Sequence, residues 1–258
     1  MCAICDTPQE ELIDSTFIIC SECNILKEIP KELVKLQALW CFLINISEIP
    51  KELVNLVELN CSICFNLKEI PKELVNLMSL NCFRCTLLKE IPKELVNLKL
   101  LNCVESMVKN IPRELVNLIH LWCDCTNIEY IPKELTKLST LCISNCLNIK
   151  EIPKELINLV ELNCDNCPNI VEIHNFKNLK LIACYNCPKL TFAPTHLIKN
   201  QVILNIIESN YQKYRKEACK KLVFTILEEL IQKTWEPKRA RDWCWDEEEK
   251  KFMNGMFY

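Results

Sequence analysis

The dipeptide Ile-Pro returns at a nearly fixed interval along most of the chain, and this period constrains the fold more than any other feature. Seven copies follow one another at spacings of 20 or 21 residues, and weaker copies stand at Ile173-His174 and Ala193-Pro194. The seven copies begin at Ile29, Ile49, Ile70, Ile91, Ile111, Ile131 and Ile152. A fixed period of this length is typical of a solenoid, in which one structural unit is stacked many times.

Each period also carries a fixed set of apolar positions. The unit that begins at Ile70 reads I-P-x-x-L-x-x-L-x-x-L-x-C-x-x-C-x-x-L. This pattern resembles the leucine-rich repeat, whose core is L-x-x-L-x-L-x-x-(N or C)-x-L, and the resemblance covers roughly residues 7–198. The IPKELVNL wording with paired cysteines is also similar to leucine-rich-repeat proteins of giant DNA viruses of amoebae. The resemblance implies a repeat solenoid with a curved parallel β-sheet and a short, irregular convex side.

The resemblance assigns a place to each position of the unit. The L-x-C part is expected to be a short strand whose leucine and cysteine point into the core, because alternate residues of a strand face opposite sides. Strands should therefore centre around Cys41, Cys61, Cys82, Cys103, Cys123, Ile143, Cys164 and Cys184. The KELVNL segment after each proline is long enough for one helical turn.

Three segments follow from this pattern. Residues 1–16 are expected to be an N-terminal cap or degenerate repeat, and residues 17–198 about nine repeats. In residues 199–258 the apolar positions change to helical spacing, as at Leu222, Ile226 and Leu230. This predicts a helix over about 209–234 that forms an α-helical C-terminal cap, since the end of a solenoid exposes its core. The alternative is a partner-recruiting motif built on Trp235, Trp243 and Trp245.

The chain holds 20 cysteines, and most of them follow the repeat. One column replaces the second leucine of the strand, and a second column stands three residues later, as at Cys61 and Cys64. Three copies carry Ile44, Ser106 or Thr126 in place of the second cysteine, and there the next apolar residue comes two positions later instead of three. The second cysteine is therefore interpreted as part of the turn that leaves the strand.

The chain holds six C-x-x-C pairs, five of them formed by the two columns, and such pairs can bind zinc or undergo redox chemistry. Here the repeat period itself produces the spacing, so we expect buried structural thiols and no metal or other cofactor. Stacked cysteines of one column point the same way, which disfavours disulfides and favours a reducing cytosol or nucleus, and we expect a cytoplasmic location. The pair Cys2/Cys5 lies outside the repeat pattern and stays unexplained.

Composition excludes several classes of function. A single glycine, Gly255, leaves no phosphate loop or nucleophile elbow, and no catalytic constellation is present, so we expect no enzyme. The net charge of −3 argues against a nucleic-acid partner. No apolar run approaches the ~18 residues of a membrane span. Residues 1–20 lack a basic start and a long apolar run, and they read poorly as a signal peptide.

The remaining prediction is a protein-interaction module that binds a protein partner through the concave face of the sheet. The resemblance to giant-virus proteins implies a viral protein that binds host factors. A metal-binding or redox protein that uses the C-x-x-C pairs is the alternative. Outward strand residues form the concave face, and exposed aromatic residues are frequent binding anchors. The asparagine column is interpreted either as a ligand-binding row of amides or as a mutually hydrogen-bonded ladder. The candidate partner-binding residues are Trp40, Phe42, Asn60, Asn81, Phe83, Asn102, Trp122, Asp124, Asn163 and Tyr185.

Overall fold

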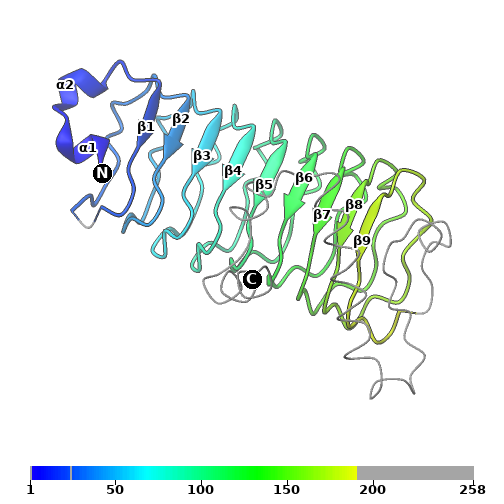
Figure 1. Cartoon of the computed structure of the whole chain (residues 1–258). Helices are drawn as coiled ribbons and strands as arrows, with labels where there is room; N and C mark the ends of the chain where they lie inside the picture. The colour runs from blue at the N-terminus through cyan, green and yellow to red at the C-terminus, as the bar shows by residue number, and fades with distance from the viewer. Residues whose placement is uncertain (1, 24, 191–258) are drawn as a thin grey trace, which may run out of the picture. The chain divides into compact units, whose positions relative to one another are not determined.

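Nine short strands stack in chain order into one parallel sheet in the computed structural model, which describes residues 2–23 and 25–190 (Figure 1). The strands are β1 (Phe17–Ile19), β2 (Ala38–Trp40), β3 (Glu58–Asn60), β4 (Ser79–Asn81), β5 (Leu100–Asn102), β6 (His120–Trp122), β7 (Thr140–Cys142), β8 (Glu161–Asn163) and β9 (Leu181–Ala183). Equivalent residues of successive repeats pair, as Leu59 pairs with Leu80. The parallel β-solenoid expected from the repeat period is confirmed.

Each strand is centred on the leucine of the repeat, two residues before the position predicted from the cysteines. In β3 the middle residue Leu59 is buried, and Cys61 follows the strand while remaining fully buried. The strand ends there because the chain turns sharply at Ile63, whose φ is 59°. The inward orientation of the leucine and cysteine columns was predicted correctly, and the strand centres were wrong by about two residues.

The segment after each proline forms two successive turns where a helical turn was expected. In the second repeat the amide of Leu53 donates to the carbonyl of Pro50 at 3.3 Å, and that of Leu56 donates to Leu53 at 3.1 Å. Both bonds span three residues, so the chain advances by separate turns instead of the four-residue bonds of an α-helix. Leucines 53 and 56 are nevertheless fully buried, because the turns direct them into the core.

One continuous core runs through the stack. In most repeats it contains the strand leucine, the following cysteine or isoleucine, the two leucines of the turns and the isoleucine before proline, almost all less than 5% exposed. No repeat could bury these side chains alone, so the stacking of neighbours supplies the burial that stabilises the fold.

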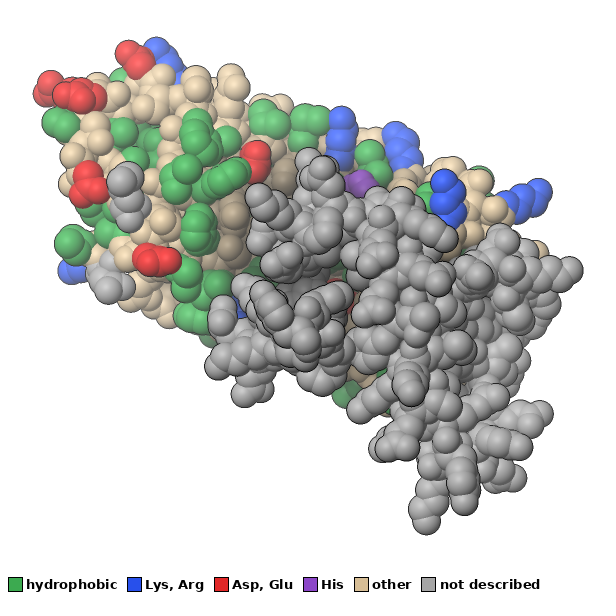
Figure 2. Space-filling model, in the orientation of Figure 1, with side chains coloured by type: hydrophobic (Ala, Val, Ile, Leu, Met, Phe, Trp, Pro, Cys, Tyr) green, Lys and Arg blue, Asp and Glu red, His purple; other side chains and the backbone are tan. Residues whose placement is uncertain are grey.

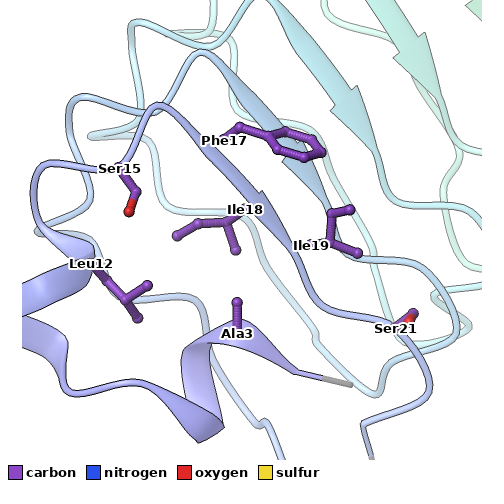
Figure 3. Close-up of a pocket in the computed structure, with 7 residues that line it drawn as sticks. All are labelled: Ala3, Leu12, Ser15, Phe17, Ile18, Ile19 and Ser21. Carbon is purple, nitrogen blue, oxygen red and sulfur yellow. The ribbon is translucent and has the colours of Figure 1, made fainter.

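The N-terminal segment packs against the first strand. Helices α1 (Ala3–Asp6) and α2 (Gln9–Leu12) lie beside β1, and Cys2 forms an isolated antiparallel bridge with Cys20 (Figure 1). Leu12 is buried, and Figure 3 shows Ile18 of β1 directed toward Leu12 and Ala3. The segment therefore covers the first repeat. The expected C-terminal cap, including the helix over about 209–234, lies outside the described residues.

Within the part of the chain that the structure describes, no helix has the length and apolar character needed to cross a membrane.

Candidate functional site: the outer face of the sheet

The outer sheet face is the surface that the sequence analysis predicted as the concave binding face. It consists of the first and third residues of each strand together with the residue that follows each buried cysteine. All ten residues predicted to bind a partner lie on this face. Nine of them are half-buried, and Tyr185 is 46% exposed. Solvent therefore reaches every candidate, while the middle residue of each strand anchors the face to the core.

Aromatic side chains are concentrated at the N-terminal end of this face. They are Phe17, Trp40 and Phe42, and Ile19 lies beside them on the same face. The ring of Phe17 meets that of Trp40 edge to face, with centroids 5.4 Å apart, and Phe17 is 48% exposed. The indole Nε1 of Trp40 donates to Oε1 of Glu58 at 2.8 Å. Figure 2 shows hydrophobic side chains gathered over the first strands. The indole is thus held in one orientation before any partner arrives.

A second aromatic group lies on β6. The imidazole of His120 stacks on the ring of Trp122 with centroids 5.5 Å apart and planes 8° from parallel. Burial lowers the pKa of His120, while the nearby carboxylate of Glu161 opposes this effect. Trp122 is four strands from Trp40, a separation of about 19 Å at the usual strand spacing.

The asparagine column between these aromatic groups holds the backbone locally instead of forming the mutual ladder that was considered. Oδ1 of Asn81 accepts the amide of Phe83 at 3.1 Å, and Oδ1 of Asn102 accepts the amide of Val104 at 3.1 Å. Asn60 accepts both the amide and the hydroxyl of Ser62. Each asparagine thus fixes the two residues at which its own chain leaves the strand.

Two aspartates connect neighbouring repeats on the same face. Oδ1 of Asp124 accepts the amide of Ser144 at 2.6 Å, and Oδ1 of Asp165 accepts the amide of Tyr185 at 2.5 Å. Burial raises the pKa of Asp124 to about 6 despite this hydrogen bond, and it also raises the pKa of Asp165. Asp124 therefore links two neighbouring repeats and is also part of the candidate binding surface.

Phe83 lies beside the charged side chain of Arg84. The guanidinium of Arg84 lies over its ring, 5.1 Å from the centroid, and also pairs with both carboxylate oxygens of Glu105 at 2.7 and 3.1 Å. The middle of the outer sheet face is consequently more polar than its N-terminal end.

Most cysteines of the described repeats are thiols buried in the core. The eighteen cysteines in the described residues form no disulfide, and most are buried. Thiols of the second column donate to backbone carbonyls of the preceding repeat: Cys64 to Cys41 at 2.9 Å and Cys85 to Cys61 at 3.0 Å. Where this cysteine is replaced, the hydroxyls of Ser106 and Thr126 donate to carbonyls of their own repeat at 2.6 Å. The second cysteine therefore belongs to the turn, as expected, and also links one repeat to the next.

Three residues of the outer sheet face were not among the predicted site residues. Phe17, Glu58 and His120 each contact a predicted tryptophan through the ring or hydrogen-bond contacts given above. All three are first residues of strands, one position before the inward leucine or isoleucine. The two-residue period of strands could have identified them as neighbours of the third position on the same face.

Comparison with known proteins supports the fold. No family model matches the sequence, and no curated protein matches it. A leucine-rich-repeat protein of Leptospira interrogans is 27% identical, with a TM-score of 0.53 over 62% of this chain and 47% of that protein. The leucine-rich-repeat domain of the type III effector XopL is 19% identical, with a TM-score of 0.63 over 77% of each chain. The described repeats have the leucine-rich-repeat fold.

A third similar structure contains a bound partner. The leucine-rich-repeat ectodomain of the Arabidopsis thaliana receptor kinase GASSHO1/SCHENGEN3, in complex with CASPARIAN STRIP INTEGRITY FACTOR 2, is 24% identical, with a TM-score of 0.50 over 65% of this chain and 24% of that chain. The present chain spans about half the length of the Leptospira protein, of which it covers 47%. These likenesses concern the fold.

Proposed function

We propose that this protein is a non-enzymatic interaction module that binds a protein partner on its outer sheet face. The observation that carries the proposal is the contrast between the two sides of each strand. The inward middle position is leucine or isoleucine in all nine strands, whereas the outward third position is Ile, Trp, Asn, Cys or Ala. Folding demands the first uniformity, and it leaves the second position free to recognise a partner.

The aromatic groups give this face its binding anchors. Tryptophan is enriched among the residues that contribute most to interface affinity. Trp40 is already oriented by Phe17 and Glu58, and Trp122 by His120, so little side-chain entropy is lost on binding. At about 3.3 Å per residue, an extended segment of about six residues would reach from one tryptophan to the other. We propose a partner with apolar groups at both ends of such a segment and polar groups between them.

The class of partner and the compartment belong to the same proposal. The receptor ectodomain in complex with CASPARIAN STRIP INTEGRITY FACTOR 2 is a precedent for ligand binding by this fold. The similarity of the IPKELVNL repeats to giant-virus proteins supports a viral origin and a host protein as the partner. Buried free thiols suit a reducing compartment, which supports a cytoplasmic location.

Affinity capture from native cytosol tests the proposal with two matched triple variants. Trp40, Phe42 and Trp122 are changed to alanine on the outer sheet face, and Val54, Val75 and Val96, exposed residues of the turns, are changed in the control. A specific partner should be retained by the wild type and the control and lost by the outer-face variant, with circular dichroism unchanged. Equal capture by all three proteins would place binding elsewhere.

A further inference from the structure

Two C-x-x-C pairs that are distant in sequence converge at the N-terminal end of the stack. Cys2 immediately precedes α1 and Cys5 lies within it, while Cys20 and Cys23 follow β1. The antiparallel bridge between Cys2 and Cys20 brings the two pairs together. Among the described residues, only Cys2, Cys5 and Cys23 form a group of three or more potential metal ligands, with their sulfurs all within 4.8 Å of one another.

The sulfur separations fit a shared metal ion. Sγ of Cys5 lies 3.5 Å from Sγ of Cys23. In a tetrahedral site with Zn–S bonds of ~2.3 Å, geometry places neighbouring sulfurs about 3.8 Å apart. A disulfide requires a much shorter separation, about 2.05 Å. Cys20 pairs with Cys2 through the backbone and is fully buried, but its sulfur is not part of this group.

Cys23 departs from the behaviour of its equivalents in the later repeats. Cys64 and Cys85 donate their thiols to carbonyls of the preceding repeat. Cys23 belongs to the first repeat, and its sulfur accepts the amide of Leu26 at 3.3 Å. An amide that donates to sulfur stabilises a thiolate, the form that binds metals. The sulfur of Cys23 thus accepts a hydrogen bond from a backbone amide, whereas the thiols of its equivalents donate to backbone carbonyls.

We propose that Cys2, Cys5 and Cys23 bind one zinc ion at the N-terminal cap, with the fourth position open to solvent beside the exposed Cys5. Cysteine thiolates are frequent zinc ligands, and zinc takes four ligands in tetrahedral geometry. The sequence-based expectation of no metal rested on the repeat spacing, and two of these ligands lie outside the repeats. The buried C-x-x-C pairs of the later repeats keep their structural role.

A metal ion would stabilise the N-terminal cap, whose helices are short. Helices α1 and α2 have four residues each, too short to be stable without tertiary contacts. Cys5 is exposed and Cys2 is buried, so the site lies at the surface with one side against the first repeat. Zinc would join α1 to the turn after β1 and would hold the cap on the open end of the stack.

Metal analysis of the full chain, produced in zinc-supplemented medium and purified under reducing conditions without chelator, tests this site. The wild type should retain about one zinc ion per chain. Cys5→Ser should lose most of it, and Cys5 is exposed, so this variant is expected to fold. Cys125→Ser is the matched control, because Cys125 is exposed and lies outside the cluster. This control should retain zinc as the wild type does.

Cobalt provides a second readout. Addition of Co²⁺ to the reduced, metal-free protein should give thiolate-to-cobalt charge-transfer absorption in the wild type and Cys125→Ser, and a much weaker band in Cys5→Ser. A strong chelator should lower the thermal midpoint of the wild type but not that of Cys5→Ser. The proposal is overturned by a metal-free wild type that shows no cobalt band, by a mapped Cys5–Cys23 disulfide, by iron in place of zinc, or by unchanged zinc in Cys5→Ser.

Discussion

Nine of the described residues, one in each described repeat, adopt a left-handed backbone conformation, and none of them is glycine. Their φ angles lie between 54° and 60°. Three are asparagines, which tolerate this region, and the others include Leu43 and the β-branched Ile63. The turn after each strand requires this conformation whatever the side chain, so the repeats accept a local cost at these positions. No sequence signal predicted this conformation, because the usual signal of such a turn is glycine and the only glycine is Gly255.

Leu43→Asn should stabilise the protein. Leu43 has a φ of 55° and is 41% exposed, so asparagine relieves backbone strain and little apolar burial is lost. We expect the free energy of unfolding to rise by about 0.5–1 kcal/mol, measured by urea denaturation. Leu147→Asn is the control, because Leu147 is exposed but is not among the residues of positive φ. A gain of equal size in both variants would assign the effect to surface polarity instead.

The buried carboxyl of Asp124 should make stability depend on pH. Burial raises its pKa from 3.8 to about 6 in the folded chain. A raised folded pKa stabilises the folded state fully below pH 3.8, and this contribution is lost as the pH rises through about 6. At pH 7 the ionised carboxylate is therefore unfavourable, by about 1–2 kcal/mol after allowance for solvent screening.

Asp124→Asn should remove this dependence. The amide oxygen of asparagine can still accept the hydrogen bond from the amide of Ser144. We expect the variant to be more stable than the wild type at pH 7 and to lose that advantage near pH 4, measured by thermal unfolding across this range. A variant that is less stable at pH 7 would show that the charge itself strengthens the bond to Ser144.

Columns of equivalent side chains form hydrogen bonds that join each repeat to its neighbour. One is the thiol column described above, and another is formed by the asparagine of the KELVNL segment. Nδ2 of Asn97 donates to the carbonyl of Val75 at 2.9 Å, and that of Asn117 donates to the carbonyl of Val96 at 2.9 Å. The same bond recurs at Asn55, Asn76, Asn158 and Asn178. Each asparagine satisfies a turn carbonyl that no strand neighbour reaches.

Asn97 tests this ladder. Asn97→Ala should lower the free energy of unfolding by about 1 kcal/mol, because one hydrogen bond between repeats is lost. Asn97→Asp should cost more than alanine at neutral pH, since its carboxylate oxygen would face the carbonyl of Val75. Chemical denaturation of both variants measures the order. If aspartate is tolerated as well as alanine, the ladder contributes little.

The sequence predicted the elements better than their links. The inward columns follow from the repeat pattern alone, so the core positions of Leu59 and Cys61 were correctly predicted. The asparagine ladder was missed because Asn97 and Val75 meet only when the register of the two repeats is known. The contact between Cys5 and Cys23 was missed for a related reason: it depends on how the cap folds back on β1, which no local period encodes.

The whole described stack is a one-dimensional object in which each repeat contacts its two neighbours. Strands pair only with the preceding and following strand, from β1 to β9. Stability is then a sum of repeat and interface contributions that is passed along the stack. A destabilising core substitution should consequently loosen mainly the repeats near it, so its effect on hydrogen exchange depends on its position in the stack.

Leu101→Ala and Leu39→Ala provide the comparison. Both leucines are fully buried middle residues of strands, in β5 and β2 respectively. Each substitution should cost about 2–5 kcal/mol, from lost burial and the cavity left behind. Leu101→Ala weakens the centre and should increase hydrogen exchange on both sides, as at the amides of Cys82 and Ile143, which bond to Asn102 and Asn163. Leu39→Ala should increase exchange at the N-terminal repeats and leave the amide of Ile143 protected, because β3 to β9 remain stacked. Exchange measured by mass spectrometry distinguishes the cases. Equal loss of protection throughout both variants would show that the nine repeats unfold as a single cooperative unit, with coupling between neighbours stronger than the cost of either cavity.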